Sequence, residues 1–396
     1  MLNPQSLPSI QAALKEQQLD GWLLYDFRGS NPIANQMLAM DGLQTRRVFA
    51  LVPSAGTPVA ISHAIEQGPW RNWPAEWPKQ IYSSWRTLEE QLGKLVQGKK
   101  VAMEYSPGDA VPYLDRVPAG VLEMVRARGA TVVSSSELVT RFYAGWSDAH
   151  IASHNRAAAA IAQIARDAIA LAGRRAREGQ PITEHELTRW ILDRFAQQNL
   201  TRGDHGPDIA ASENAANPHY EASPAHPRPI KAGDILLIDL WAREMTDTGV
   251  FADQTWMASI GPPSTRALEI WNAVRDARDA AIDLVETRVR AGERLRGGDV
   301  DDAARRVIEA RGFGKNFTHR TGHSIDSRDL HGSGPNMDNL ETRDERHLIP
   351  GVAFSIEPGI YVLGEIGMRS EVNVYIADGK AVVTPANYQR ELIVAE

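Results

Sequence analysis

Two segments of the chain each carry a pair of acidic residues on what the sequence predicts to be two strands joined by a turn. Asp239 and Asp253 lie in DILLIDLWAREMTDTGVFADQTWMASIG, and Glu357 and Glu371 lie in GVAFSIEPGIYVLGEIGMRSEVNVYIA. Both pairs are 14 residues apart (253 − 239 and 371 − 357). Acidic side chains on apolar strands constrain the fold strongly, because each buried charge needs a compensating partner.

The spacing predicts how the acids are paired. In an antiparallel hairpin, residues that face each other have a constant sum of residue numbers. The first pair sums to 492, centred on Thr246, and the second to 728, centred on Gly364. Without a bulge, each pair is predicted to lie directly opposite, with Cβ atoms about 4.5–5.5 Å apart. Like charges this close require a cation, a shared proton or an arginine.

Histidines supply further candidate ligands. His319, His323 and His331 lie in FTHRTGHSIDSRDLHGSG, and His219 lies in ASENAANPHYEASPAH. The chain has no cysteine, so a bound metal would need His, Asp and Glu. Four carboxylates with one imidazole suit two Mn, Co, Fe or Zn ions about 3.5–4 Å apart. Two alternatives remain open, namely separate pairing of each acid with arginine and ordinary loop histidines.

Composition limits the classes of protein to consider. With 396 residues the chain is longer than one average domain, and its 43% hydrophobic and 23% charged residues are typical of a globular protein. A net charge of −7 argues against a nucleic-acid partner. No apolar run reaches the ~18–20 residues that cross a bilayer, and MLNPQSLPSIQAALKEQQLDG does not resemble a secretory signal. We therefore expect a cytoplasmic protein without membrane or nucleic-acid partners.

The pattern of predicted helices and strands changes near Trp146. Residues 1–145 alternate predicted helices with short apolar strands such as GWLLYDF, which predicts an α/β domain with a helix-covered mixed sheet. Residues 146–396 begin with an Ala-rich helix and a second helix, in which Thr183 and Glu186 form a capping-box pattern, and a further long helix is expected near 265–292. We place the domain boundary between residues 145 and 146.

A Trp-rich stretch lies in the first domain. Trp70, Trp73, Trp77 and Trp85 all lie in GPWRNWPAEWPKQIYSSW. Two interpretations remain open. The tryptophans pack locally beneath a Pro-rich loop, or they project as an aromatic lid or dimer contact, since exposed tryptophan is typical of interface hot spots.

Together the motifs of residues 145–396 resemble the pita-bread metallopeptidase family of methionine aminopeptidase, aminopeptidase P and prolidase, most closely prolidase. The resemblance implies an α/β (α+β) catalytic domain of two pseudo-twofold halves. LDGWLLYDFRGSNPIANQML is similar to the creatinase/prolidase-like N-terminal α/β domain. The metal ligands that the resemblance implies are Asp239, Asp253, His323, Glu357 and Glu371.

The resemblance also implies an activity. Two divalent ions per subunit, with manganese as first choice and zinc or cobalt as alternatives, would activate water to hydrolyse the Xaa-Pro bond of a dipeptide. Glu357 would transfer the proton, and His219 or His331 would stabilise the oxyanion. Residues on the substrate side would be His219, His319, His331 and Arg369. The expected partners are a small peptide with proline at its second position and a second copy of the chain in a homodimer.

Several departures from the family pattern leave specificity open. Thr255 is followed by Trp256 where the family has arginine, and His331 is followed by Gly332 where an acid is common. An Xaa-Pro aminopeptidase acting on longer peptides therefore remains an alternative to a dipeptidase. A non-catalytic peptide-binding relative and a metal-free, creatinase-like amidinohydrolase are more distant alternatives, because both would lack parts of the acidic cage.

Overall fold

The computed structural model describes residues 1–396, which divide into two compact units, Met1–Tyr143 and Ala144–Glu396. The first unit is a six-stranded sheet in the order β4-β3-β2-β1-β5-β6, with parallel and antiparallel neighbours. Its strands are β1 (Gly21–Asp26), β2 (Val48–Pro53), β3 (Val59–His63), β4 (Lys79–Tyr82), β5 (Lys100–Met103) and β6 (Thr131–Ser134). Its helices are α1 (Leu7–Glu16), α2 (Pro32–Met37), α3 (Trp85–Val96), α4 (Ala119–Ala127) and α5 (Ser136–Phe142). The predicted helix-covered mixed sheet is confirmed.

The sheet of the first unit is buried on both faces. Every residue of β1 is buried, and alternate residues contribute to two separate hydrophobic clusters. Trp22 and Leu24 belong to the cluster that includes α1 and α2, whereas Leu23 and Tyr25 belong to the cluster that includes α3 and α4. A strand covered on both sides is a continuous apolar run, which is why GWLLYD shows no alternation.

Three of the four tryptophans in the Trp-rich stretch pack on one another. Trp70 contacts Trp73, and Trp73 contacts Trp77, both edge to face, with ring centroids 5.4 and 5.1 Å apart. Trp85, at the start of α3, is more than half exposed and lies against the guanidinium of Arg86. The structure therefore favours local packing for the first three rings and leaves only Trp85 projecting.

The second unit contains two pairs of helices and the strands between them. Its helices are α6 (Asp148–Arg177), α7 (Glu184–Gln197), α8 (Thr265–Arg290) and α9 (Gly297–Ala310), with short 3-10 turns η4 (Ser212–Ala216) and η5 (Gly314–Asn316). Its strands are β7 (Leu200–Thr201), β8 (Asp208–Ala211), β9 (Ile235–Glu244), β10 (Ala252–Ile260), β11 (Ala353–Ile356), β12 (Gly359–Val362), β13 (Ile366–Arg369), β14 (Val372–Ala377), β15 (Lys380–Thr384) and β16 (Ile393–Ala395).

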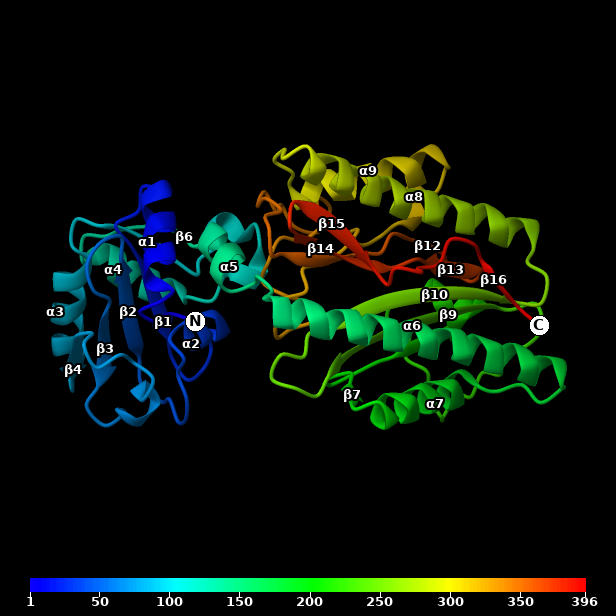
Figure 1. The fold of residues 1–396 in the computed structure, drawn as a ribbon, viewed down its shortest axis with the longest axis horizontal. Helices are drawn as coiled ribbons and strands as arrows, with labels where there is room; N and C mark the ends of the chain where they lie inside the picture. Colours follow the sequence, from blue (N-terminus) through cyan, green and yellow to red (C-terminus); the bar gives the residue numbers. More distant parts are fainter. The chain divides into compact units, whose positions relative to one another are not determined.

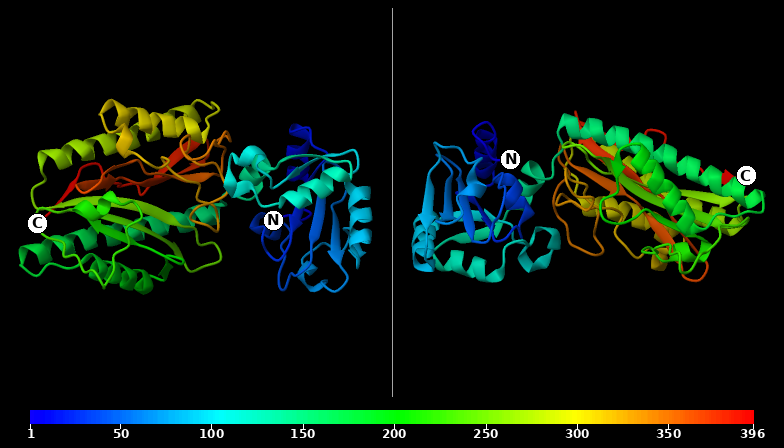
Figure 2. Two further views of the ribbon diagram at one scale, coloured as in Figure 1. Left: turned by 180° about the vertical axis from the view of Figure 1, so that it is seen from behind. Right: turned by 90° about the horizontal axis from the view of Figure 1, so that it is seen from below.

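These strands form a central layer between the helix pairs (Figure 1), and the same layering is visible from behind (Figure 2). Helices α6 and α7 share a core with one face of β9 and β10, and α8 and α9 share a second core with the opposite face and with β11 to β14. Each half thus consists of two helices followed by strands, in agreement with the two-halved fold that the resemblance implies. No helix in the chain has the length and apolar character that a membrane crossing requires.

Local sequence signals explain the helix boundaries. Helix α7 begins at the predicted capping box, in which the Thr183 hydroxyl accepts from the Glu186 N–H and the Glu186 carboxylate accepts from the Thr183 N–H. Helix α9 is absent from the sequence-based expectation, because it begins with two glycines. Gly297 is required there, since a Cβ atom would lie 1.8 Å from the carbonyl oxygen of Asn336.

Candidate metal centre

The first acid pair lies on the β9–β10 hairpin, but not in the predicted register. Asp239 is paired with Thr255, and Asp253 with Trp241, so paired residues sum to 494 rather than 492. The prediction that the two aspartates face each other directly is wrong, because the connecting loop is centred on Asp247, one residue later than expected. A shift of two positions keeps both side chains on one face, where they are diagonal neighbours.

The second acid pair follows the predicted register. Ser355 pairs with Asn373, and Gly359 pairs with Arg369, so the ladders on both sides of the glutamates sum to 728. Between these two ladders, the backbone N–H groups of Glu357 and Glu371 point to other segments and not to each other. The Glu357 N–H donates to the Thr321 carbonyl at 2.7 Å, and the Glu371 N–H points to the Thr255 carbonyl at 3.4 Å. These contacts join the glutamates to the histidine-bearing loop and to β10.

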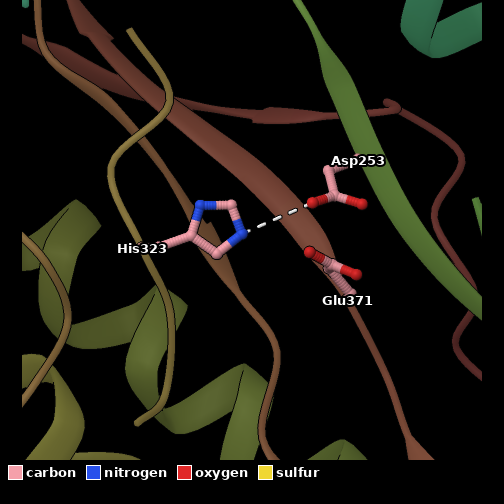
Figure 3. A group of neighbouring side chains, drawn as sticks. All are labelled: Asp253, His323 and Glu371. Atoms are coloured by element: carbon pink, nitrogen blue, oxygen red, sulfur yellow. Dashed lines mark ion pairs between the residues drawn. The ribbon is translucent and has the colours of Figure 1, made fainter. Parts of the chain in front are cut away.

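Asp253, His323 and Glu371 converge from three different segments, as Figure 3 shows. One oxygen or nitrogen from each lies within 4.8 Å of the others, and each residue is only 4% exposed. The His323 Nε2 atom lies 3.4 Å from an oxygen of Asp253 and 3.4 Å from an oxygen of Glu357. Its Nδ1 atom is 3.1 Å from the Ser324 carbonyl, which fixes Nδ1 as the donor and leaves Nε2 free to bind a cation.

Unsatisfied carboxylate oxygens make this cluster a candidate cation site. Asp239 Oδ1, Asp253 Oδ1 and Glu371 Oε1 are buried without a hydrogen-bond partner. Burial raises the pKa of all three carboxyls, and repulsion between neighbouring acids raises it further. A divalent cation would satisfy these oxygens and remove the repulsion. Carboxylates with one imidazole fit Mn, Zn, Co or Fe.

Glu357 is the exception among the four acids. Burial raises its pKa, but His323, His319 and Arg369 outweigh burial, so that its pKa lies below the ordinary value for glutamate. Its Oε1 atom accepts a hydrogen bond from the Ser355 hydroxyl at 2.9 Å. Glu357 is therefore the carboxylate of the cluster that stays ionised most readily.

Arg369 contacts Asp239 and lies near Glu357. Its guanidinium donates to Asp239, to the Thr255 hydroxyl at 3.0 Å and to the Tyr361 hydroxyl at 2.8 Å. Pairing with arginine thus accounts for part of the charge of Asp239, but no salt bridge joins Asp253 or Glu371 to an arginine. Because Arg369 is buried and its donors are engaged, a direct role in orienting substrate would require these bonds to break.

His319 is also engaged within the protein. Its Nδ1 atom lies 2.7 Å from the Arg320 carbonyl, and its Nε2 atom lies 2.8 Å from the Tyr361 hydroxyl. Burial lowers its pKa and so favours the neutral ring, in which Nε2 accepts a hydrogen bond from the Tyr361 hydroxyl. Tyr361 is in turn fixed between His319 and Arg369. The geometry gives His319 a part in holding this network and leaves it no free ring nitrogen for a substrate.

The other two histidines lie at the edge of the cluster. His331 packs on His323 with ring centroids 4.3 Å apart, and the neighbouring His323 together with burial lowers its pKa. His219 is exposed, while Pro218 and Tyr220 on either side of it line a narrow pocket together with Asp208 and Arg369. Both residues are exposed, whereas His319 is partly buried.

Trp256, which departs from the family pattern, points away from the acids. Strand residues alternate between faces, so Asp253 and Thr255 lie on one side of β10, and Gln254 and Trp256 on the other. The indole N–H donates to Gln254 at 2.9 Å, and Arg166 of α6 lies over the ring. Trp256 therefore belongs to the core beneath α6 and does not alter the cluster.

Sequence reasoning missed several residues that contact the site. Asp208 on β8 is paired with Asp239 on β9, and burial raises its pKa. The Asn373 side chain accepts from the Asp253 N–H at 2.8 Å, and Thr255 donates to Glu371 at 2.9 Å. Nothing in the local pattern marks these residues, because strand pairing between distant segments creates each contact.

Comparison with known proteins identifies the family of the chain. The chain matches the model of metallopeptidase family M24 over residues 153–378. It is 32% identical to a Xaa-Pro dipeptidase of Lactobacillus delbrueckii subsp. lactis over 163 residues, which is 41% of this chain and 40% of that protein. The chain spans about half the length of the curated relatives that it matches.

Solved structures resemble the whole chain. Dipeptidase PepE from Mycobacterium ulcerans superimposes with a TM-score of 0.70 and 22% identity, covering 98% of this chain and 97% of that chain. Recombinant prolidase from Thermococcus sibiricus superimposes with a TM-score of 0.68 and 23% identity, covering 100% and 99%. At this identity the likeness shows the fold, and the match to the family model confirms the resemblance drawn from the sequence.

Proposed function

Because the chain belongs to metallopeptidase family M24, we propose that it is a divalent-metal-dependent peptidase that hydrolyses the Xaa-Pro bond of dipeptides. The observation that carries the proposal is the set of buried carboxylate oxygens without partners around His323. Such a set is costly unless a cation binds. It lies near a narrow pocket that is lined by Arg369 and by Pro218 and Tyr220, the two neighbours of His219.

The proposed metal ligands are the five residues named from the sequence. Asp253, His323 and Glu371 already converge, and Asp239 and Glu357 border them. We propose that they hold two divalent ions, with manganese as first choice and zinc or cobalt as alternatives. When bound, such a pair lowers the pKa of water toward 7 and polarises a carbonyl group.

Glu357 is proposed as the residue that takes the proton from the attacking water and passes it to the leaving nitrogen. Its lowered pKa supports this role, because a general base must be ionised at working pH. The Ser355 hydroxyl holds one oxygen of Glu357 in place. The other oxygen lies 3.9 Å from Arg369, which favours the ionised form.

His219 and His331 are proposed to contact the substrate and to stabilise the oxyanion of the tetrahedral intermediate. Both lie at the accessible edge, and a neutral imidazole can donate one hydrogen bond to a developing negative charge. His319 is proposed to act one step removed, by fixing Tyr361 and through it Arg369. Arg369 is proposed to orient Asp239 rather than the substrate.

A dipeptidase must also bind the free carboxylate beside the scissile bond. Arg369 is committed to the cluster, so we propose Arg320 together with His331. Arg320 is close enough to lower the pKa of His331, which places positive charge at the accessible edge. The substrate's proline lacks an N–H and has a fixed φ, so a site that demands no donor there would select it.

An Xaa-Pro aminopeptidase is the second candidate. Burial of Arg369 favours it, since one of the expected carboxylate-binding groups is not available. The two candidates differ in whether the enzyme tolerates peptide residues beyond proline.

For either enzyme we also propose a homodimer, which sedimentation velocity would test. Replacement of the exposed Trp85 by alanine would show whether that ring is part of the contact.

The deciding experiment measures steady-state hydrolysis of Ala-Pro, Ala-Pro-Ala and Ala-Ala by protein stripped of metal and reloaded separately with Mn, Co and Zn. We expect cleavage of Ala-Pro and little cleavage of Ala-Ala. Cleavage of the tripeptide at its Ala-Pro bond would assign the aminopeptidase instead. No hydrolysis with any metal, despite two bound ions, would contradict the substrate assignment and point to a non-catalytic relative.

A further inference from the structure

We propose that Glu184, at the first turn of α7, is a positioning residue that clamps the segment 211–220 and thereby sets the place of His219. The inference rests on the proposed function, because His219 matters only if it contacts a substrate. Glu184 lies far from the metal-ligand cluster in sequence. Its side chain is nonetheless turned inward, and the residue is only 1% exposed.

Both oxygens of the Glu184 carboxylate are used on this one segment. The Ala211 N–H donates to Oε1 at 2.7 Å, and the Tyr220 hydroxyl donates to Oε2 at 2.7 Å. The side-chain amide of Asn214 lies 3.1 Å from each oxygen. A single carboxylate therefore joins the beginning, the middle and the end of a ten-residue segment (211–220), and His219 immediately precedes its last contact.

The first part of the segment has a second polar anchor, whereas the last part is otherwise held by the packing of Tyr220 on the hydrophobic core. The Ser212 hydroxyl donates to Asp234 at 2.9 Å, and Arg228 pairs with both Asp234 and Glu213. Beyond Asn214, the polar side-chain contact that ties the segment to a helix is that of Tyr220 with Glu184. Loss of Glu184 should therefore release the part that carries His219 more than the part near Ser212.

The segment 211–220 also packs closely against β13, the strand that carries Arg369. A Cβ atom at Gly367 on β13 would lie 1.8 Å from the Ala215 carbonyl oxygen, so the two backbones are in the closest contact that glycine permits. Arg369, which holds Asp239, is two residues further along β13. Tyr220 lines the same pocket as Arg369. Glu184 thus fixes the pocket wall as well as His219.

The chemistry of the contacts favours a carboxylate. Ala211, Asn214 and Tyr220 all donate, and a carboxylate offers two accepting oxygens, whereas glutamine offers one oxygen and adds two donors. Burial raises the pKa of Glu184, but the position in the first turn of α7 and the three donor groups favour the charged form. Replacement by glutamine keeps the size of the side chain but exchanges one accepting oxygen for an NH2 donor.

The experiment compares Glu184→Gln with Glu186→Gln, a matched change two residues away. Glu186 is exposed and belongs to the capping box, in which glutamine serves as well as glutamate. Hydrogen–deuterium exchange of the full metal-loaded chain is measured first. We expect faster exchange in residues 211–220 for Glu184→Gln and wild-type exchange there for Glu186→Gln. Equal exchange in that segment for both variants would overturn the clamp.

Kinetics then tests the route to catalysis with a double-mutant cycle that includes His219→Ala. We expect Glu184→Gln to lower kcat/KM for Ala-Pro by about 10- to 100-fold, as for other residues that orient a catalytic group. In the His219→Ala background the same change should cost less than about twofold. Independent, multiplicative effects would show that Glu184 does not act through His219 and would overturn the inference.

The two arms separate this inference from the proposed function. If the wild-type protein hydrolyses no Xaa-Pro peptide, the proposed function fails, while the exchange experiment still decides whether Glu184 holds the segment. If the wild type is active and Glu184→Gln retains full kcat/KM, the proposed function stands and the positioning role is refuted.

Discussion

Each unit of the molecule contains buried carboxylates, but the hydrogen-bond partners of these carboxylates differ between the two units. In the first unit Glu104 is 0% exposed, and it accepts from the Trp22 indole at 2.6 Å, the Asn31 amide at 2.8 Å and the Ser135 hydroxyl at 3.0 Å. In the second unit Asp239, Asp253 and Glu371 each keep one buried oxygen without any partner.

The difference shows that burial of an acid does not by itself indicate a metal site. Burial raises the pKa of Glu104 just as it raises the pKa of Asp253. The two sites differ in the hydrogen-bond donors that surround their buried carboxylates. Neutral N–H and O–H groups complete the shell around Glu104, whereas the cluster in the second unit offers further acids and the free nitrogen of His323. Only the latter arrangement needs a cation.

The largest expected effect concerns Glu357, the acid whose pKa is lowered. We expect Glu357→Gln to reduce kcat for Ala-Pro by about 10²- to 10⁴-fold at saturating metal, because the amide cannot take a proton. Circular dichroism should show an intact fold. Glu104→Gln serves as the control and should keep near-wild-type kcat in the fraction that is folded. A wild-type rate for Glu357→Gln would end its assignment as the base.

Asp253→Asn should weaken metal binding on the order of 100-fold, since an amide oxygen carries no charge to offset the cation. Elemental analysis after dialysis against a chosen free metal concentration gives the stoichiometry, and titration calorimetry gives the affinity. Glu104→Gln should bind the same amount of metal as the wild type. The cage assignment would be contradicted if Asp253→Asn retained both stoichiometry and affinity.

Metal removal should destabilise the second unit in a pH-dependent way. The folded-state pKa values of Asp239, Asp253 and Glu371 lie above their unfolded values, so the folded apoprotein holds more protons than the unfolded chain. The stability of the apoprotein therefore falls as pH rises from about 4 toward the folded pKa values. Bound ions replace these protons.

We therefore expect the gain in Tm from manganese to be larger at pH 7.5 than at pH 5. At a fixed free manganese concentration equal to 100 times the Kd at pH 7.5, one ion adds about 2.7 kcal/mol to the free energy of unfolding at that pH, and less at pH 5, where protons compete for the ligands. Calorimetric scans with and without chelator at the two pH values measure this gain. A gain independent of pH, or larger at pH 5, would show that metal does not displace protons from this cluster.

Glu104→Gln tests the other side of the comparison. The glutamine amide would face donors from Trp22, Asn31 and Ser135, so we expect a loss of about 1–3 kcal/mol in the free energy of unfolding of the first unit. Urea denaturation followed by tryptophan fluorescence measures it. The second unit's response to manganese should be unchanged. A stability equal to the wild type would mean that the donors around Glu104 contribute nothing specific.

The smallest effect is expected at Trp256. Trp256→Phe removes the hydrogen bond to Gln254 and part of the contact with Arg166, which should cost about 1 kcal/mol of stability. Because the ring points away from the acids, kcat/KM for Ala-Pro should change less than about twofold. A tenfold change would mean that the departure from the family pattern at this position does affect specificity.

Much of the fold and of the candidate site could be predicted from local pattern. The strand GWLLYD, the capping box at Thr183 and Glu186, and the register of Glu357 with Glu371 all depend on residues near one another in the chain. The register of Asp239 with Asp253 was predicted wrongly, because it depends on a loop whose geometry the spacing does not specify.

The amino-acid sequence by itself determined which ionisable and metal-ligating side chains are present: two equally spaced acid pairs on apolar strands, a histidine-rich loop and no cysteine. The tertiary structure decided which groups meet. Only packing buries Asp253, His323 and Glu371 together, gives Glu357 a lowered pKa, commits Arg369 to Asp239 and turns Glu184 onto the segment 211–220 that carries His219. The physical reason is that pKa and hydrogen-bond satisfaction depend on neighbours across strand pairings, which spacing along the chain does not contain.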